Sequence, residues 1–361
     1  MSIAFRNEID VTVAFEGNVI RAVEILPRAR PPLTRLFAGK PASSLLSVLP
    51  RLFSLCSAAH QVAFVSAVEA ARGEDANPEV KQQRMKAVVA ERLTELVRGL
   101  FLGRSAPDQA SAAILRELLQ TLAVIGGGSS AGDVRRQAVS RISTALASLG
   151  ISRDAAPKPG SALAHQLANL EDGALAPVAL APSFLSAADD RDIAVRLIAE
   201  GTTFSDAPDL DGRIPETGVW ARHSTWSAAT PDRGGPAERL KAKIAEAGRL
   251  GAWLEGDEDR VLGESSIESY RLGAGQGTAA VECARGRLYH AVELDREGRI
   301  VRFEFLAPTE WNFHTRGPLV RALEGAAVED GLPGREAVRA LVGSFDPCVG
   351  FNLTFREAVH A

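Results

Sequence analysis

The chain has 361 residues, of which 46% are hydrophobic and 24% charged, with 41 Lys and Arg residues against 45 Asp and Glu residues. At roughly 100–200 residues per domain, this length supplies enough core for the chain to fold without disulfides or a structural metal. The net charge of −4 gives no electrostatic reason to expect a nucleic-acid partner, so that class of function is excluded.

Cysteine content and hydropathy indicate the compartment. The three cysteines, Cys56, Cys283 and Cys348, lie far apart, and an odd number suits a reducing cytoplasm better than a disulfide framework. No run of about 20 apolar residues is present, and the polar start MSIAFRNEID lacks the basic and apolar halves of a signal peptide. We therefore expect a cytoplasmic protein without membrane insertion.

The first part of the chain predicts one hairpin followed by helices. Residues 9–26 alternate apolar and polar side chains around a turn at 16–18, which is typical of a β-hairpin. Apolar residues recur at helical spacing over 42–53, and a longer helix is expected to cross Cys56 and to end at Gly73. Three further helices are predicted over 79–103, 108–125 and 131–149, which favours an antiparallel bundle.

The second part of the chain mixes helices and strands. A helix over 236–255 begins with Pro and ends on Gly, the usual order of these residues at helix ends. Short alternating segments after about residue 275 predict strands over 279–284, 286–294 and 299–308. Short helices are also expected over 161–171, 187–200, 316–324 and 334–343. The fold class is therefore α+β and mainly helical.

Two cysteines occupy positions that could carry chemistry. Cys56 and His60 are four residues apart, so on a helix they would share a face and could bind one ligand or form a Cys–His pair. Cys348 follows Asp346-Pro347 and is predicted in a loop or at a helix start, where a helix dipole would lower the pKa of its thiol. A buried structural role is the alternative for each thiol, because free cysteine is among the most buried residue types.

Both cysteine segments resemble metal-binding motifs of the nickel–iron hydrogenase large subunit. The segment from Arg51 to His60 is similar to the family's Arg-x-Cys-x-x-Cys-x-x-x-His, with Phe53 in place of the first cysteine. The segment from Asp346 to Thr354 is similar to Asp-Pro-Cys-x-x-Cys-x-x-His, with Phe351 in place of the second cysteine. Each motif therefore keeps one of its two thiols.

Three more segments follow the family in order. Residues 282–290 look like Glu-Ala-Pro-Arg-Gly-x-Leu-x-His, 307–312 like Val-Pro-Thr-Thr-Trp-Asn, and 216–222 like Glu-x-Gly-Pro-Leu-Ala-Arg. The resemblance implies a single domain over 1–361 with the fold of a hydrogenase large subunit. Its parts would be an N-terminal hairpin and Cys56 helix over 1–75, a shortened helical middle over 76–209, and a C-terminal part with Cys348 over 210–361.

The resemblance also assigns roles by motif position. Cys56 takes the place of a thiolate that bridges nickel and iron, and Cys348 that of a terminal nickel ligand. Phe53 and Phe351 cannot ligate a metal, so the resemblance implies iron and makes nickel unlikely. Residues in the family's pocket around the iron-bound cyanides correspond to Arg285, Pro308 and Thr309, with His60 as the motif histidine. Cys283 would share a strand face with Arg285, so a third thiol ligand is left open.

This pattern resembles the HupK/HoxV type of hydrogenase expression and formation proteins, paralogues of the large subunit that act in its maturation. It implies a scaffold or carrier, not an enzyme, that transiently holds an iron dicyanide carbonyl unit. The implied partners are the hydrogenase large subunit and the general hydrogenase maturation proteins. Two alternatives stay open: a residual hydrogenase-like or Cys–His enzyme using Cys56 and His60, and a metal-free protein that only binds partner proteins.

Overall fold

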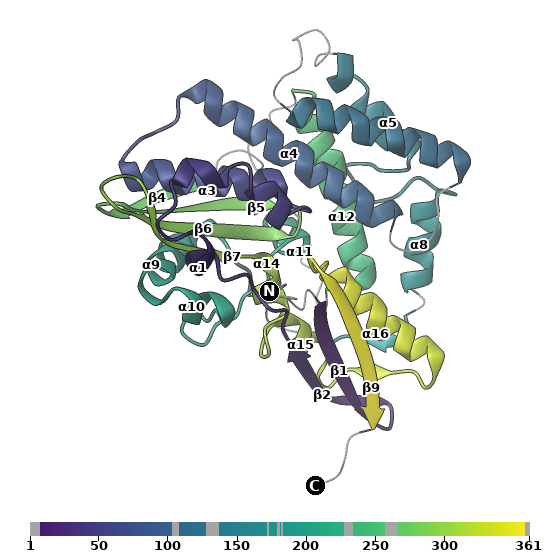
Figure 1. Cartoon of the computed structure of the whole chain (residues 1–361). Helices are drawn as coiled ribbons and strands as arrows, with labels where there is room; N and C mark the ends of the chain where they lie inside the picture. Colours follow the sequence, from purple (N-terminus) through teal and green to yellow (C-terminus); the bar gives the residue numbers. More distant parts are fainter. Residues whose placement is uncertain are drawn as a thin grey trace.

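The chain folds into two β-sheets and a layer of helices (Figure 1). The computed structural model describes residues 8–102, 108–127, 137–171, 173–178, 181, 183–226, 234–256 and 266–357. Within these residues, no helix is both long and apolar enough to cross a membrane.

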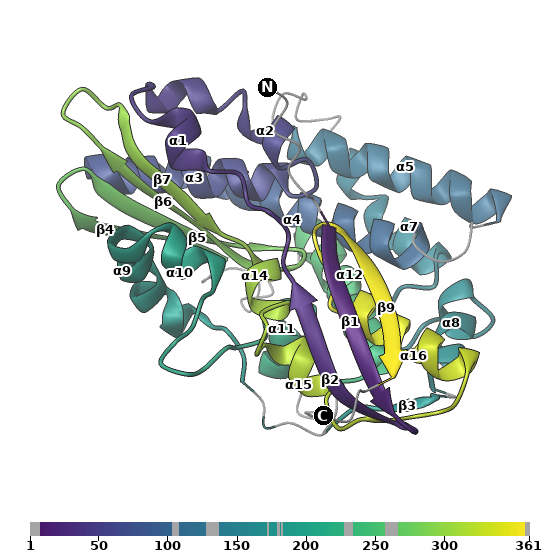
Figure 2. The same ribbon diagram turned by 60° about the horizontal axis from the view of Figure 1, so that its bottom comes forward.

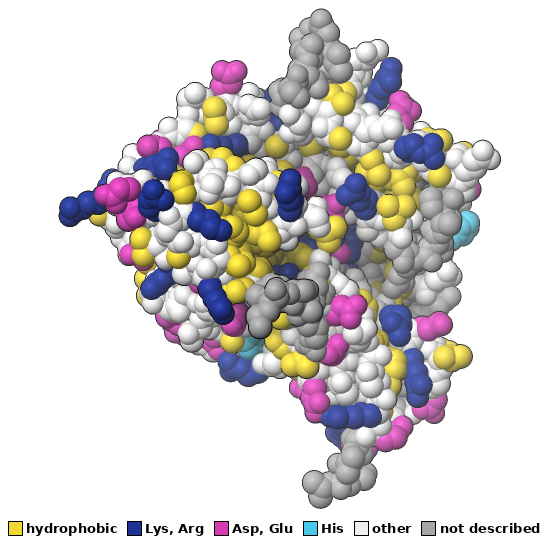
Figure 3. All heavy atoms as spheres, in the orientation of Figure 1, with side chains coloured by type: hydrophobic (Ala, Val, Ile, Leu, Met, Phe, Trp, Pro, Cys, Tyr) yellow, Lys and Arg dark blue, Asp and Glu magenta, His cyan; other side chains and the backbone are white. Residues whose placement is uncertain are grey.

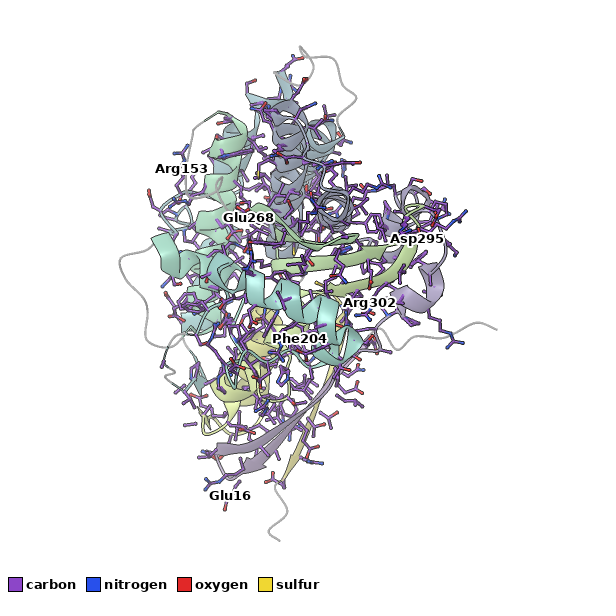
Figure 4. The ribbon with its side chains drawn as sticks, turned by 90° about the vertical axis from the view of Figure 1, so that its left-hand side faces the viewer. Glu16, Arg153, Phe204, Glu268, Asp295 and Arg302 are labelled. Atoms are coloured by element: carbon purple, nitrogen blue, oxygen red, sulfur yellow. The ribbon has the colours of Figure 1, made fainter. Side chains whose placement is uncertain are left out.

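A four-stranded antiparallel sheet lies between helices on both faces. Its order is β4-β5-β6-β7, with bounds Ile267–Gly273, Gln276–Cys283, Gly286–Leu294 and Ile300–Leu306. α3 (Ser57–Arg72) covers one face, while α9 (Asp190–Glu200) and α10 (Thr202–Asp206) cover the other (Figures 1 and 4). In Figure 4, Phe204 on α10 and Arg302 on β7 mark the second of these contacts. The predicted strands are confirmed.

The packing of α3 on this sheet is close enough to require glycine. A Cβ atom on Gly277 of β5 would lie 2.2 Å from the carbonyl oxygen of Ala67 and 2.4 Å from the amide of Ala71. Both atoms belong to the α3 backbone, so neither can move aside. Strand β4 was not predicted. It lies at the edge of the sheet, and polar side chains such as Glu268 and Arg271 interrupt the apolar pattern that would indicate a strand.

The second sheet joins the two ends of the chain. β1 (Glu8–Glu16) and β2 (Val19–Leu26) form the predicted hairpin, and Gly17 takes the positive φ of +55° that its turn requires. The strand β9 (Gly350–Glu357) runs parallel to β1, so Ile9 pairs with Phe351. β8 (Ala327–Val328) and β3 (Leu175–Ala176) complete the order β3-β8-β2-β1-β9, and α15 (Pro318–Leu323) and α16 (Leu332–Ser344) supply helices to its core.

The helical layer contains the predicted bundle (Figure 2). Its core joins Leu93, Leu118 and Ile244, which are all nearly inaccessible to solvent. The members are α4 (Pro78–Phe101), α5 (Gln109–Gly126), α7 (Ile142–Ser148), α8 (Ala162–Glu171), α11 (Val219–Trp226) and α12 (Pro236–Leu254). The first part of the helix predicted over 131–149 lies outside the described residues.

The segment before Cys56 differs from the prediction. It forms three short helices, α1 (Leu33–Phe37), the 3-10 helix η1 (Ala42–Leu45) and α2 (Leu49–Leu52), instead of one continuous pattern. α3 begins only at Ser57, so Cys56 precedes the helix with a non-helical φ of −128°. Glu91 on α4 fixes this start, because its carboxylate accepts hydrogen bonds from the amides of Ala58 at 2.7 Å and Ala59 at 2.9 Å.

A buried ion pair joins α9 to the sheet. Asp190 is inaccessible to solvent and accepts hydrogen bonds from Arg287 Nε at 2.6 Å and from the hydroxyls of Tyr289 and Tyr270 at 2.8 Å each. Arg287 is only 1% exposed. The 3-10 helix η2 (Ala187–Asp189) leads directly into this aspartate.

We expect Asp190→Asn to lower the free energy of unfolding by about 3–5 kcal/mol, because it leaves the Arg287 guanidinium buried beside a neutral amide. Denaturant titration followed by circular dichroism measures this loss. Tyr270→Phe, which removes one hydroxyl from the same carboxylate, should cost only about 1.5 kcal/mol. Equal costs for the two variants would contradict a dominant role of the ion pair.

Candidate functional site

The fold brings Cys56 and Cys348 together from opposite ends of the chain. Cys56 lies just before α3, and Cys348 lies in the loop between α16 and β9. The parallel pairing of β9 with β1 returns this loop to the N-terminal segment. The two side chains lie close enough for each thiol to shift the pKa of the other. Cys348 is in a loop, and the helix-start alternative is wrong.

Cys283 places a third thiol beside Cys56. It ends β5, is 1% exposed, and belongs to the same buried cluster as Cys56, close enough to affect the pKa of that thiol. The expectation that Cys283 and Arg285 share a strand face is wrong, because Arg285 lies in the two-residue turn between β5 and β6. Both side chains nevertheless reach Cys56, because the chain reverses direction at this turn.

Arg285 supplies a buried positive charge next to the thiols. Its Nη1 donates to Cys56 Sγ at 3.5 Å and to Glu95 Oε2 at 3.2 Å. Its Nε lies 3.6 Å from Asp346 Oδ1, which is beyond hydrogen-bond distance. Among the described atoms, this buried Nε has no hydrogen-bond acceptor. The site therefore holds one buried N–H donor that is ion-paired with Asp346 but lacks a hydrogen-bond acceptor in the described part of the chain.

A short helix forms the opposite wall. α14 (Pro308–Asn312) begins with the buried Pro308, and Thr309 is 4% exposed. The amide of Cys348 donates to Thr309 Oγ1 at 3.4 Å, and Thr309 is one of the groups that lower the pKa of the Cys348 thiol. Arg28, which follows β2, donates to Glu310 at 3.0 Å and adds a second positive charge near Cys348.

The surroundings make the two thiols unequal. Hydrogen bonds with Cys283 and Cys348, together with burial, raise the pKa of Cys56 well above its ordinary value. The hydrogen bond from Cys56 and the positive charges of Arg285 and Arg28 lower the pKa of Cys348 to about 6. Cys348 is partly exposed, whereas Cys56 is 5% exposed. A ligand arriving from solvent therefore meets Cys348 first.

His60 has a different setting from the one predicted. Cys56 lies outside the helix, so the two residues do not share a helical face. The His60 ring stacks on Phe53 at 3.7 Å between centroids, and its Nδ1 lies 2.7 Å from His290 Nε2. Burial lowers the pKa of both histidines, to about 3 for His290. These contacts show that His60 packs against Phe53 and His290, and its predicted contact with a cofactor stays a prediction.

The two phenylalanines of the motifs pack against protein. Phe53 contacts His60 and lies 5.0 Å from the Phe305 ring, while Phe351 contacts the core of the five-stranded sheet. In the described part of the chain, no three His, Cys, Asp or Glu side chains are arranged to hold a metal ion by themselves. A metal bound between Cys56 and Cys348 must therefore bring other ligands with it.

Two hollows lie near the site. One of about 610 Å³ is lined by Arg28, Thr309 and Glu310, of which Thr309 contacts Cys348, and another of about 940 Å³ is lined by Lys243, Asp346 and the loop residues on either side of Cys348. Figure 3 shows hydrophobic side chains gathered near the middle of one face of the molecule. The exposed Leu46, Leu52 and Leu55 precede Cys56 in the chain.

Sequence reasoning missed several residues of this site. Glu95 and Arg28 belong to none of the sequence motifs, and only the tertiary fold brings them to the site. His290 is the last residue of the segment that resembles the family's Arg-Gly motif. Its position in that motif could have indicated that it lies near the site. Thr309 and Arg285 lie near Cys348, and Pro308 precedes Thr309 in α14; their role in binding a cofactor stays a prediction.

Solved structures establish the fold of the chain. The Ni-Fe-Se hydrogenase of Desulfomicrobium baculatum matches with a TM-score of 0.60 at 14% identity, over 93% of this chain and 95% of that one. A [NiFeSe] hydrogenase variant from Desulfovibrio vulgaris Hildenborough gives a TM-score of 0.62 at 14% identity, over 93% and 94%. The predicted α+β fold of a hydrogenase large subunit is confirmed.

Sequence comparisons are more specific. Residues 242–352 match the family model described as nickel-dependent hydrogenase. The hydrogenase expression/formation protein HupK of Bradyrhizobium diazoefficiens is 62% identical over the full length of both chains. HupK of Rhizobium leguminosarum bv. viciae is 35% identical, over 97% of this chain and 98% of its own. The chain therefore belongs to the HupK family of hydrogenase expression/formation proteins.

Proposed function

We propose that this protein acts in hydrogenase maturation by holding an iron unit with two cyanides and one carbon monoxide, and then releasing it toward a hydrogenase large subunit. The observation that carries the proposal is the pair of adjacent thiols, Cys56 and Cys348, beside the Nε of Arg285, which has no hydrogen-bond acceptor among the described residues. The maturation role is supported by the relatives, which are hydrogenase expression/formation proteins. The nature of the cargo and the partner is our inference.

The donor set fits a metal that arrives already ligated. Iron(II) with strong-field ligands is six-coordinate, and three of those positions are filled by the diatomic ligands of the unit. Two cysteine thiolates are soft donors of the kind that hold iron in proteins. The described residues offer two adjacent thiols and no complete metal site of their own, which suits such a cargo better than a bare ion.

The polar groups around the thiols fit the diatomic ligands. A metal-bound cyanide presents a nitrogen lone pair that accepts hydrogen bonds, whereas a bound carbon monoxide is a poor acceptor. Arg285 Nε is a buried donor without an acceptor, so a cyanide nitrogen would satisfy it. The guanidinium is also permanently charged, which favours an anionic ligand in a site with little water. Pro308 and Thr309 close the opposite side.

Exposure of the two thiols supports a carrier. Cys348 is partly exposed next to the hollow lined by Arg28 and Thr309, while Cys56 is buried beneath it. A unit would therefore bind Cys348 first on loading and leave it last on release. Thiol ligands must lose their protons when iron binds, so loading releases protons to solvent.

The enzymatic alternatives have less support. A Cys–His enzyme needs a histidine ring aimed at the nucleophile, but His60 stacks on Phe53 and its Nδ1 contacts His290. A residual hydrogenase needs the two cysteine ligands whose motif positions are occupied here by Phe53 and Phe351. A protein that only binds partners does not need to hold two thiols beside a buried guanidinium, because burial of that charge costs stability.

We expect protein purified without oxygen, after co-production with the general maturation machinery, to contain iron and little nickel. The reason is that only two of the four motif thiols remain. Elemental analysis by plasma mass spectrometry measures both metals on one sample. Stoichiometric nickel together with hydrogen evolution by the same protein would overturn the carrier function.

The two thiols are tested by infrared spectroscopy of the same preparation. Cys56→Ala and Cys348→Ala should each abolish the cyanide and carbon monoxide bands while the helical circular dichroism stays at the wild-type level. Cys56→Ser should fail as well, because an alkoxide is harder and far more basic than a thiolate. Cys283→Ala is the matched control, since Cys283 is equally buried and adjoins Cys56 but is not assigned as a ligand here. Full bands in a Cys56→Ala, Cys348→Ala double variant would refute the assignment.

Arg285 is tested by the position of the cyanide bands. Arg285→Leu should shift these bands and weaken retention of iron roughly 10–100-fold, because a buried hydrogen bond to a charged group contributes about 1.5–3 kcal/mol. Arg285→Lys keeps the charge beside Glu95 and Asp346 but loses the planar fork, so it should retain more iron with shifted bands. Wild-type bands and iron content in both variants would show that Arg285 does not contact the cargo.

A further inference from the structure

We propose that the segment from Glu216 to Arg222 is a bracket that holds Arg285 at a fixed position relative to Thr309, and so sets the geometry in which the diatomic ligands are bound. By bracket we mean Glu216, Thr217, Gly218 and Arg222. The ligand named here rests on the proposed function. The bracket itself rests on hydrogen bonds and close contacts between backbone segments.

Arg222 holds the turn that carries Arg285. Its Nη1 donates to the carbonyl oxygen of Cys283 at 3.3 Å, and its Nη2 donates to that of Ala284 at 3.0 Å. The same guanidinium is anchored by Glu246 on α12, with Nε 2.9 Å from Oε2. One side chain thus links the backbone on the N-terminal side of Arg285 to the helical layer.

Thr217 and Gly218 support the turn from its other side. A Cβ atom on Gly218 would lie 2.7 Å from the carbonyl oxygen of Arg285, so these two backbone segments touch. Gly218 also has a φ of +117°, which side-chain-bearing residues rarely adopt. Thr217 Oγ1 accepts a hydrogen bond from the amide of Arg287 at 3.0 Å. Arg285 is therefore fixed on both sides in sequence.

The bracket is also hydrogen-bonded to α14, the helix that contains Thr309. The amide of Thr217 donates to Asn312 Oδ1 at 3.0 Å, and Asn312 Nδ2 donates back to the Thr217 carbonyl at 2.9 Å. Asn312 ends α14, one helical turn after Thr309. Because Thr217 bonds to both walls, the spacing between Arg285 and Thr309 depends on it.

The bracket has a rigid base. Both carboxylate oxygens of Glu216 bind the guanidinium of Arg239 on α12, with Nη2 2.9 Å from Oε2, and both side chains are less than 10% exposed. A pocket of only about 20 Å³ remains next to Thr217, Gly218 and Arg285, which is space for about one water molecule. The turn thus has little room to shift backward. This rigidity matters because a diatomic ligand offers only one acceptor atom. If Arg285 is displaced, its N–H group cannot form a hydrogen bond to that atom.

The test compares Arg222→Gln with Arg92→Gln. Arg92 is a matched control: it is 1% exposed and donates to the same Glu246 at 3.0 Å, but among the described residues it makes no hydrogen bond to the turn that carries Arg285. In Arg222→Gln we expect shifted or broadened cyanide bands and several-fold less retained iron. In Arg92→Gln we expect wild-type band positions with a similar loss of thermal stability. Equal band shifts in the two variants would overturn the bracket.

Hydrogen–deuterium exchange of the iron-free protein gives a readout that does not depend on the cargo. Backbone amides of 283–288 should exchange faster in Arg222→Gln and at the wild-type rate in Arg92→Gln. Unchanged exchange over 283–288 in Arg222→Gln would refute the bracket. Absence of diatomic bands from wild-type protein would instead refute the proposed function, and the exchange result would then decide the bracket alone. Thr217→Val, which keeps the side-chain shape and loses the acceptor for Arg287, replaces Arg222→Gln if that variant is insoluble.

Discussion

The burial of the Arg285 guanidinium beside two thiols is the constraint on which the site depends. Removing this charge from water costs several kcal/mol, and only nearby anionic groups can offset that cost. Glu95 reaches it from α4 and Asp346 from the loop after α16, and Cys56 accepts from its Nη1. Segments distant in sequence must therefore pack together before the arginine is stable, which couples assembly of the site to folding of the whole chain.

Local patterns predicted most elements of the fold, but not the parts that depend on distant pairing. The hairpin over 9–26 and the helices α4, α5 and α12 follow from alternation, helical spacing and end signals. The parallel pairing of β9 with β1 has no local signal, because the register is set by side chains far apart in the chain. Cys56 lies just before the helix that was predicted to contain it. The start of this helix is capped by the carboxylate of Glu91, which lies on another helix.

The site was predictable to the extent that motifs resemble a known family. Cys56, Cys348, Arg285 and Thr309 came from motif positions, and the structure places them side by side. His60 was predicted both from its four-residue spacing to Cys56 and from its place as the motif histidine. The spacing argument required Cys56 to be helical, and Cys56 precedes the helix. Partners such as Glu95 are charged side chains on an amphipathic helix, indistinguishable in sequence from solvent-facing ones until the helix is packed.

Under the proposed function, replacement of two motif thiols by phenylalanine would favour release of a metal over its retention. Each phenylalanine contributes to packing where the motif has a ligand: Phe53 stacks on His60, and Phe351 packs on the core of the five-stranded sheet. A site with fewer thiolates binds a metal more weakly, so a partner with more donors can remove the metal from it. A carrier has to release its cargo, so a complete set of four buried thiolates would work against it. The proposed carrier therefore needs fewer thiolates than a permanent metal site, provided that the groups which recognise the other ligands of the metal remain in place.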